Sequence, residues 1–221
     1  MTARTLRQII GGTRHLLLDF DGPVCDIFAG ISDQAVADEL RRELRAAGID
    51  IPEGATALDD PLEVFRVVAD LGDNAAITAQ GLLTALELQA AQTARPTPGA
   101  ADLITTATQT SRTVTVVTNN SGAAVAYYLV RHHLDQYVGK IVGRDDPDPA
   151  LMKPSPYQVR YAVGLLQAEP AEYVFIGDST TDVLAGLLGG VAVIGYANKP
   201  GKAEALSQGG ARARVLAETV V

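Results

Sequence analysis

The sequence predicts an α/β protein that has a doubly wound parallel sheet, a Rossmann-like core, and a small all-helical cap domain. Three observations lead to this prediction. Short apolar runs rich in β-branched residues alternate with longer helix-like stretches, the runs end in turn residues, and one long segment after the first run shows helical patterns only. Strands that alternate with helices indicate a parallel sheet that is covered on both faces.

Four apolar runs are predicted to be strands buried on both faces, because each is short, apolar and followed by residues that break regular structure. They cover residues 15–20 (HLLLDF), 112–118 (RTVTVVT), 173–176 (YVFI) and 191–194 (VAVI). Helical patterns separate them, over residues 99–110, 123–133, 155–167 and 181–188. The alternation predicts that each strand returns to the sheet through a helix.

Residues 25–95 are predicted to form the cap domain, and residues 1–24 and 96–221 the core. No strand is expected in the cap segment, only three helices with readable ends. They run from the capping residue Ser32 to Gly48, from Asp60 to Gly72, and from about Asn74 to Thr93. Pro96 and Pro98 then mark a hinge where the chain returns to the core.

The overall charge limits the choice of partners. The chain has 18 Lys and Arg against 26 Asp and Glu, a formal net charge of -8. Such an excess of negative charge repels nucleic acids and anionic membranes, so a small metabolite is the expected partner. A single cysteine, Cys25, suits a reducing compartment, and no apolar run reaches the ~18 residues that a membrane helix needs. We therefore expect a cytoplasmic protein.

The first predicted strand delivers two carboxylates in the string Asp19-Phe20-Asp21-Gly22. Open α/β sheets bind ligands at the carboxyl ends of their strands. Since the strand ends between the two aspartates, both can reach one site. One carboxylate can then attack phosphorus while the other protonates the leaving oxygen and later activates water. A capped turn is the alternative interpretation, because Asp and Gly are ordinary turn residues.

Three further polar groups follow the later parts of the sheet. Thr118 and Asn119 end the second strand and can bind phosphate oxygens, although such residues also cap helices. Lys153 can offset negative charge at the site, although a Lys-Pro pair is common in solvated loops. Asp178 and Asp182 follow the third strand and suit a hard cation, although they also suit a helix start.

Together, in this order and placement, these residues resemble the four motifs of the haloacid dehalogenase superfamily, with a helical insert where its caps usually lie. The resemblance implies a phosphatase in which Asp19 forms an aspartyl-phosphate and Asp21 acts as general acid and base. It also implies roles in phosphate binding for Gly22, Thr118, Asn119 and Lys153. Mg²⁺ would be held by Asp19, the Asp21 backbone carbonyl and Asp178, with Asp182 supporting the metal site from behind.

Several neighbouring residues are given no catalytic role. The family usually has Thr or Val two residues after the second aspartate, where this chain has Pro23, which lacks a backbone N–H. Cys25 is expected to be a packed thiol. Arg41, Arg42 and Arg45 are expected to form a solvated helix face.

Five other functions share part of this pattern. Dehalogenases and phosphonate hydrolases of the superfamily lack the second acidic residue, so Asp21 argues against both. A sugar-phosphate mutase keeps both aspartates and stays as the alternative enzyme. A response-regulator receiver has its phospho-accepting aspartate on a later strand. In this chain the candidate nucleophile, Asp19, lies at the first strand, which argues against a receiver. A non-catalytic phospho-acceptor or partner-binding domain is the alternative outside the enzymes, but such relatives tend to lose acidic residues that are all present here.

Overall fold

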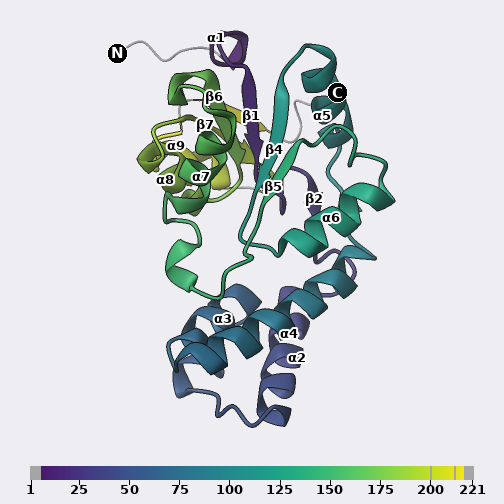
Figure 1. Ribbon diagram of the computed structural model, residues 1–221, viewed down its shortest axis with the longest axis vertical. Helices are drawn as coiled ribbons and strands as arrows, with labels where there is room; N and C mark the ends of the chain where they lie inside the picture. The colour runs from purple at the N-terminus through teal and green to yellow at the C-terminus, as the bar shows by residue number, and fades with distance from the viewer. Residues whose placement is uncertain (1–5, 200, 212, 217–221) are drawn as a thin grey trace.

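The computed structural model describes residues 6–199, 201–211 and 213–216 of the chain. Figure 1 shows a sheet flanked by helices in one half of the molecule and a helical cap in the other. The sheet has six strands in the order β5-β4-β1-β6-β7-β8, and every neighbouring pair is parallel. The strands are β1 (His15–Leu18), β4 (Thr113–Val117), β5 (Lys140–Val142), β6 (Tyr173–Gly177), β7 (Ala192–Ala197) and β8 (Ala213–Leu216).

Helices cover both faces of the sheet, as the sequence predicts. Alternate residues of β1 point to opposite faces. Leu16 and Leu18 pack in a core cluster with residues of α5 and α6, whereas Leu17 packs with residues of α7 and α8. The core helices are α1 (Leu6–Gly11), α5 (Ala100–Gln109), α6 (Gly122–Arg131), α7 (Tyr157–Leu166), α8 (Thr180–Leu188) and α9 (Lys202–Gln208), with the 3-10 turns η2 (Pro149–Leu151) and η3 (Pro170–Glu172). The prediction of a doubly wound α/β core is confirmed.

The position of β1 determines where a ligand can bind. After β1 the chain builds β4 and β5 on one side, and then crosses to build β6, β7 and β8 on the other. In register, Leu18 of β1 lies beside Val116 of β4 and Ile176 of β6. The residues that follow these three strands therefore emerge at the same edge, at the point where the connections diverge. Ligands of open α/β sheets bind at such a point.

The two outermost strands were not predicted. β5 has only three residues and β8 has four, and each lies at an edge of the sheet. Edge strands are often short and carry charged residues, and such strands lack the continuous apolar run of a central strand. The apolar pattern in the sequences KIV and ARVL is therefore too weak to predict a strand.

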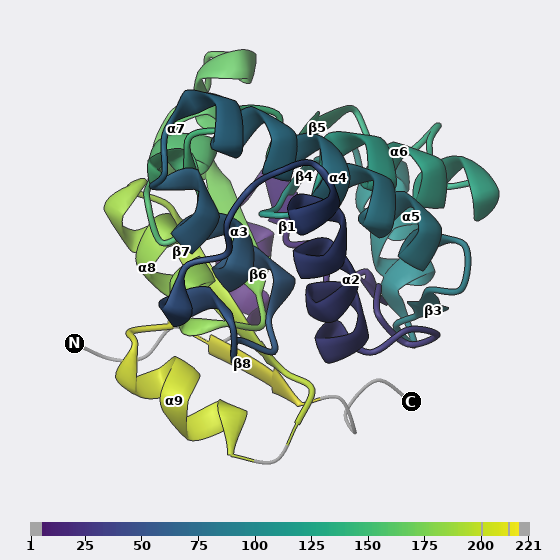
Figure 2. The same cartoon turned by 90° about the horizontal axis from the view of Figure 1, so that it is seen from below.

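The cap consists of α2 (Asp33–Ala46), the 3-10 turn η1 (Glu53–Ala55), α3 (Pro61–Ala69) and α4 (Asp73–Ala91). Ser32 and Asp60 cap α2 and α3 as predicted, each accepting a backbone N–H two or three residues later. The three helices bury a core of their own, which includes Leu40, Phe65 and Leu83. In Figure 2, viewed from below, they lie in front of the sheet.

The prediction that the cap segment contains no strand is wrong. β2 (Cys25–Asp26) pairs antiparallel with β3 (Arg95–Pro96), so that the chain leaves for the cap and returns from it along one short ribbon. The Arg95 guanidinium donates to the Asp26 carboxylate at 2.7 Å. Two-residue strands have no readable periodicity, and the partners are far apart in sequence, so no local pattern revealed them. Cys25 itself is fully buried, as expected of a packed thiol.

The predicted solvated face of α2 is wrong for Arg41, which is only 5% exposed. Its guanidinium donates to the carbonyl oxygens of Ala55 at 3.1 Å and Leu58 at 2.7 Å, and it pairs with Asp38. Arg41 therefore holds the loop between α2 and α3 through its carbonyl groups. Such a backbone contact is invisible in the sequence. Arg42 and Arg45 are exposed as expected.

Candidate active site

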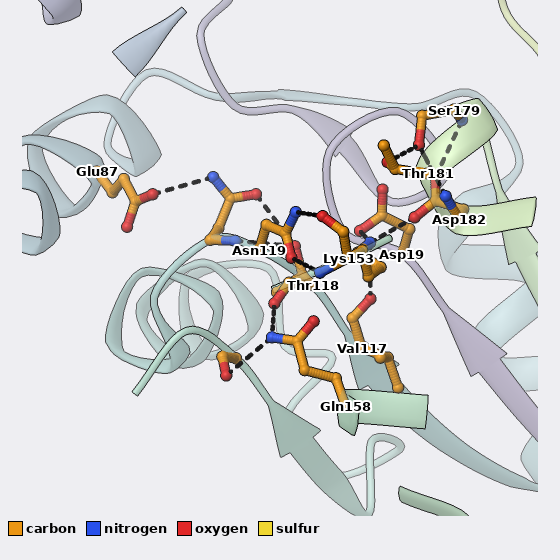
Figure 3. A network of polar contacts seen from close by, with 12 residues as sticks. Asp19, Glu87, Val117, Thr118, Asn119, Lys153, Gln158, Ser179, Thr181 and Asp182 are labelled. Atoms are coloured by element: carbon orange, nitrogen blue, oxygen red, sulfur yellow. Dashed lines mark hydrogen bonds and ion pairs between the residues drawn. The ribbon is translucent and has the colours of Figure 1, made fainter. Parts of the chain in front are cut away.

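The predicted site residues lie around the carboxyl ends of β1, β4 and β6. Figure 3 shows Asp19, Thr118, Asn119, Lys153 and Asp182 among them. Asp19 follows β1 directly, and its backbone N–H donates to the Ile176 carbonyl at 2.9 Å, which extends the parallel pairing by one residue. The Lys153 ammonium donates to Asp19 Oδ1 at 2.7 Å and to the Val117 carbonyl at 3.3 Å. It also binds Asp182 Oδ1. The fold thus brings together residues that lie 134 positions apart.

Charge in this centre is concentrated and shielded from solvent. Asp19 is 7% exposed and Lys153 only 2%. Burial, followed by the negative charge of Asp182, raises the pKa of Asp19 to about 8, while Lys153 acts in the opposite direction. Burial alone lowers the pKa of Lys153, but the charges of Asp182 and Asp19 outweigh it and the pKa is raised. The lysine therefore stays protonated, and Asp19 requires further positive charge nearby to be fully ionised at neutral pH.

Asp21 lies in the tight turn that follows β1. Its Oδ1 accepts the Ile27 backbone N–H at 3.0 Å. Burial raises the pKa of Asp21 to about 7, although this hydrogen bond lowers it. A carboxyl group with such a pKa can exist in both protonation states near neutral pH, as a general acid and base must. Pro23 does not disturb the turn, because the N–H groups that donate to the Phe20 carbonyl come from Val24 and Cys25.

Gly22 lies in the same turn with φ of 102°, in the left-handed region that favours glycine. A Cβ atom at this position would lie 2.4 Å from Cγ of Asp178, so only glycine lets the two loops approach. Its backbone N–H donates to the Cys25 carbonyl at 2.6 Å. The structure therefore gives Gly22 a steric role beside Asp178, and its predicted phosphate contact stays a prediction.

Thr118 and Asn119 form the turn after β4 and lie beside Lys153. The Asn119 side chain bonds the lysine backbone twice: its Oδ1 accepts the Lys153 N–H at 2.8 Å, and its Nδ2 donates to the Lys153 carbonyl at 3.1 Å. Thr118 is 1% exposed, and its Oγ1 donates to Asn120 Oδ1 at 3.2 Å. Asn119 thus orients the loop that carries the lysine.

Asp178 and Asp182 follow β6 and complete an acidic group. One carboxylate oxygen from each of Asp19, Asp178 and Asp182 lies within 4.8 Å of the others. Asp182 Oδ2 accepts the Ser179 N–H at 3.0 Å and the Ser179 hydroxyl at 2.6 Å, so this carboxylate is held on both sides. Asp178 accepts Asn198 Nδ2 at 3.0 Å and pairs with Lys202.

These residues suit a magnesium ion, the metal that the sequence predicts. Mg²⁺ prefers hard oxygen ligands, and buried like charges need a cation. The space is shaped for the carboxylates, because a Cβ at Gly177 would lie 2.3 Å from Cβ of Asp182. The acidic triad can therefore hold a divalent metal.

A cavity of about 270 Å³ opens above this centre, between core and cap. Sequence analysis missed Arg66, a cap residue that lines it. Arg66 Nη2 donates to the Lys153 carbonyl at 2.7 Å, and Nη1 donates to the Pro149 carbonyl at 3.2 Å. This contact ties α3 to the loop of the lysine. An arginine on an amphipathic helix usually faces solvent, so the sequence offered no signal for it.

A buried ion pair behind the phosphate-binding turn was also missed. Glu87 of α4 and Arg144 each have fully buried side chains and pair at 2.8 Å. Glu87 also accepts the Ser121 N–H at 2.8 Å and Asn120 Nδ2 at 3.2 Å, while Arg144 Nε donates to the Asn119 carbonyl at 3.1 Å. The pair thus joins the cap to the turn after β4. A signal existed: Glu87 is the only charged residue between positions 74 and 94.

Comparison with known families identifies the class of protein. The family model described as haloacid dehalogenase-like hydrolase matches residues 13–190, most of the chain. The chain therefore belongs to the haloacid dehalogenase-like hydrolases, and the resemblance seen in its motifs is confirmed, as is the prediction that it is a hydrolase. The matched range includes every predicted site residue.

Individual relatives carry related names. The chain is 26% identical to a phosphoglycolate phosphatase of Photorhabdus laumondii over 90% of this chain and 88% of that protein. It is 37% identical to a plasmid-encoded phosphoglycolate phosphatase of Cupriavidus necator, but that match spans 39% of this chain and only 38% of that protein's length. Among solved structures, a predicted phosphatase from Clostridium acetobutylicum has a TM-score of 0.68 at 21% identity, covering 92% of this chain and 94% of that one. This last likeness shows the fold alone.

Proposed function

We propose that this hydrolase is a magnesium-dependent phosphatase that cleaves a small-molecule phosphate monoester through an aspartyl-phosphate on Asp19. The observation that carries the proposal is the buried contact of 2.7 Å between Lys153 and Asp19, at the edge of an acidic triad. A nucleophilic carboxylate, a fixed lysine and a metal-binding group are what phosphoryl transfer to an aspartate requires. The names of the relatives support phosphate ester hydrolysis.

The residues divide the reaction between them. Asp19 attacks phosphorus, and the bond to the leaving oxygen breaks as Asp21 gives that oxygen its proton. Thr118 and Lys153 hold the phosphoryl oxygens, and the ammonium offsets their charge. Asp21 then takes a proton from water, which attacks the aspartyl-phosphate and releases phosphate. The Asp21 pKa of about 7 suits both halves of this cycle.

Asp19, the backbone carbonyl of Asp21 and Asp178 would hold the magnesium ion. Asp182 would fix the arrangement from behind, because both of its carboxylate oxygens already accept hydrogen bonds. When bound, the ion supplies positive charge that orients the phosphoryl group and offsets its negative charge.

The proposal is tested by a screen of phosphate monoesters under three conditions: with magnesium, with a chelator, and with magnesium and a sugar phosphate added as phosphoryl acceptor. We expect release of inorganic phosphate that requires magnesium. Phosphate transfer to the added sugar phosphate without release would instead indicate the mutase. Binding without any turnover would indicate the non-catalytic alternative.

Asp178→Asn is expected to weaken magnesium binding sharply. The carboxylate stands at the end of a buried strand, and a neutral amide is a weaker ligand for Mg²⁺. The magnesium concentration that gives half-maximal activity should rise ~10- to 100-fold. Metal titration of phosphatase activity measures this value, with Asp102→Asn, an exposed carboxylate on α5, as control. An unchanged half-saturation point would show that Asp178 is not a metal ligand.

Asp21→Asn is expected to slow hydrolysis of alkyl phosphates more than that of nitrophenyl phosphate. Alkoxide is a poor leaving group and needs a proton, and general acid catalysis contributes ~100- to 10,000-fold. Nitrophenolate needs little protonation. Since Asp21 also acts in the second step, single-turnover phosphorylation of the enzyme is the appropriate measurement. Equal losses for both esters would mean that Asp21 positions the turn and donates no proton.

The expected partner is a small phosphorylated metabolite, and we propose a cytoplasmic location. The net charge of -8 supports the small partner, because it disfavours nucleic acid and anionic membrane surfaces. The single cysteine, Cys25, suits a reducing compartment. None of the helices in the described part of the chain has the length and apolar character needed to cross a bilayer.

A further inference from the structure

The outer end of the active-site cavity is built from the cap and decides what the leaving group meets. The inner end holds Asp19, Asp21, Thr118 and Lys153, where the phosphoryl group belongs. The cap residues that line the cavity are Phe28, Asp33, Asp60, Leu62, Glu63 and Arg66. Three of these six side chains are carboxylates, so the outer wall is acidic.

The three carboxylates form no direct ion pair in the described part of the chain, although the charge of Arg66 is felt by Asp60 and Glu63 and that of Lys199 by Asp33. Asp33 lies in the first turn of α2 and Glu63 in the first turn of α3, while Asp60 caps α3 by accepting the Leu62 N–H at 2.7 Å. Among residues 9–199 and 201–211, no lysine or arginine lies within ion-pair distance of any of them. Burial and then the charge of Asp60 raise the pKa of Asp33, as expected for carboxylates that repel each other.

Arg66, the cation of this wall, is already engaged. Both of its terminal nitrogens donate to backbone carbonyls of the core, at Pro149 and Lys153. Two of its five N–H donors are used in this way, and the nearby charges of Asp60 and Glu63 partly offset its positive charge before a substrate carboxylate could use it. A second cavity, of about 410 Å³, shares Asp33 with the first and contains Lys199. Arg95 and Lys202 also line this second cavity, but they pair with Asp26 and Asp178. Lys199 acts electrostatically on Asp33, and a negatively charged leaving group would have to reach this lysine instead.

We propose that the alcohol released from the substrate carries a further hydroxyl group or an amine, and carries neither a carboxylate nor a second phosphate. The proposal rests on the proposed function. Hydroxyl and ammonium groups donate hydrogen bonds, which Asp33 and Glu63 can accept. A negatively charged group would instead meet three like charges, and such repulsion is a usual source of specificity. This substrate class differs from the phosphoglycolate in the names of the relatives.

Three esters of nearly equal size isolate the charge of the leaving group: 2-hydroxyethyl phosphate, 2-aminoethyl phosphate and 2-phosphoglycolate. Each is added as a competitor while nitrophenyl phosphate is hydrolysed with magnesium, so that an inhibition constant is obtained even for a poor substrate. We expect 2-phosphoglycolate to bind about tenfold more weakly than the other two, because like charges repel across the cavity. The difference should shrink at high salt, which screens exposed charges.

A double variant tests whether the cap carboxylates cause this order. Asp33→Asn with Glu63→Gln removes two charges and leaves the helix cap at Asp60 intact. We expect the ratio of the inhibition constants of 2-phosphoglycolate and 2-hydroxyethyl phosphate, called the gap below, to fall to about threefold or less, because the repulsion is reduced. Asp50→Asn with Asp73→Asn is the matched control, since it removes two exposed charges that line a different surface pocket of the cap. This control should keep the wild-type gap.

The outcomes separate this inference from the proposed function. If nitrophenyl phosphate is hydrolysed but 2-phosphoglycolate binds as tightly as the other two esters or more tightly, the inference is overturned. Loss of that tight binding in Lys199→Ala would then place the leaving group in the second cavity. An unchanged gap in the double variant also overturns it. A complete lack of magnesium-dependent hydrolysis would contradict the proposed function itself.

Discussion

Asp19→Asn is expected to abolish turnover while the protein stays folded. In the wild type, Asp19 Oδ1 accepts a hydrogen bond of 2.7 Å from the Lys153 ammonium, and the amide oxygen of the variant can still accept it. The amide cannot, however, form an acyl-phosphate as a carboxylate does. Loss of a covalent nucleophile should lower kcat by on the order of 10,000-fold or more. Phosphate release from a monoester measures kcat. Mass spectrometry of acid-quenched enzyme should show one added phosphoryl group on the wild type and none on the variant.

The control for this experiment is Asp102→Asn, which removes an exposed carboxylate of α5 and should keep wild-type turnover. Circular dichroism and the unfolding midpoint establish whether each variant is folded. Folding of Asp19→Asn is expected because the substitution removes a buried negative charge that burial and the charges of Asp182 and Asp178 disfavour, as the raised pKa of Asp19 reflects. Turnover within tenfold of wild type in a folded variant would contradict the aspartyl-phosphate mechanism.

Glu87→Gln is expected to lower the free energy of unfolding by about 3 kcal/mol, and Glu87→Ala by more. Both side chains of the pair with Arg144 are fully buried, and removing one partner leaves the other charge without compensation. Glu87 also accepts the Ser121 N–H at 2.8 Å, so the cap loses a contact with the turn after β4. Urea unfolding measures the change, provided that the slope of the free energy of unfolding against urea concentration is the same in both proteins.

Glu39→Gln is the matched control, because Glu39 pairs with Arg42 on the exposed surface of α2. Its effect should be at most about 1 kcal/mol. Glu87→Met combined with Arg144→Met removes both charges and should recover much of the loss. A change within about 0.5 kcal/mol of wild type for Glu87→Gln would show that the pair does not stabilise the junction of core and cap.

How much of the site the sequence reveals depends on the kind of residue. Asp19, Asp21, Thr118 and Asp178 follow central strands, and a buried strand that ends in polar residues is visible as a local pattern. Their convergence follows from the rule that parallel strands share one carboxyl edge. Lys153 lies between η2 and α7 and not directly at the end of a strand, so only the order of the motifs singled it out.

Contacts that a side chain makes to the backbone of another part of the chain were not predicted, even for Asn119, which the sequence singled out only as a phosphate-binding residue. Arg66 and Asn119 hold Lys153 by bonding its backbone, and Arg41 bonds two loop carbonyls. A backbone carbonyl is present at every position, so the sequence gives no mark of which one is bound. Glu87 alone left a trace, as an isolated charge in an otherwise uncharged helical segment.

By itself the sequence determined the class of fold, the helical cap and the acidic and basic groups of the site, because these depend on local periodicity and on the order of strand ends. Only the tertiary structure decided which side chains meet across the junction of core and cap. It paired Glu87 with Arg144, directed Arg66 to Lys153 and placed three carboxylates over the cavity. Such contacts depend on how two separately packed units are set against each other, and no local pattern records that arrangement.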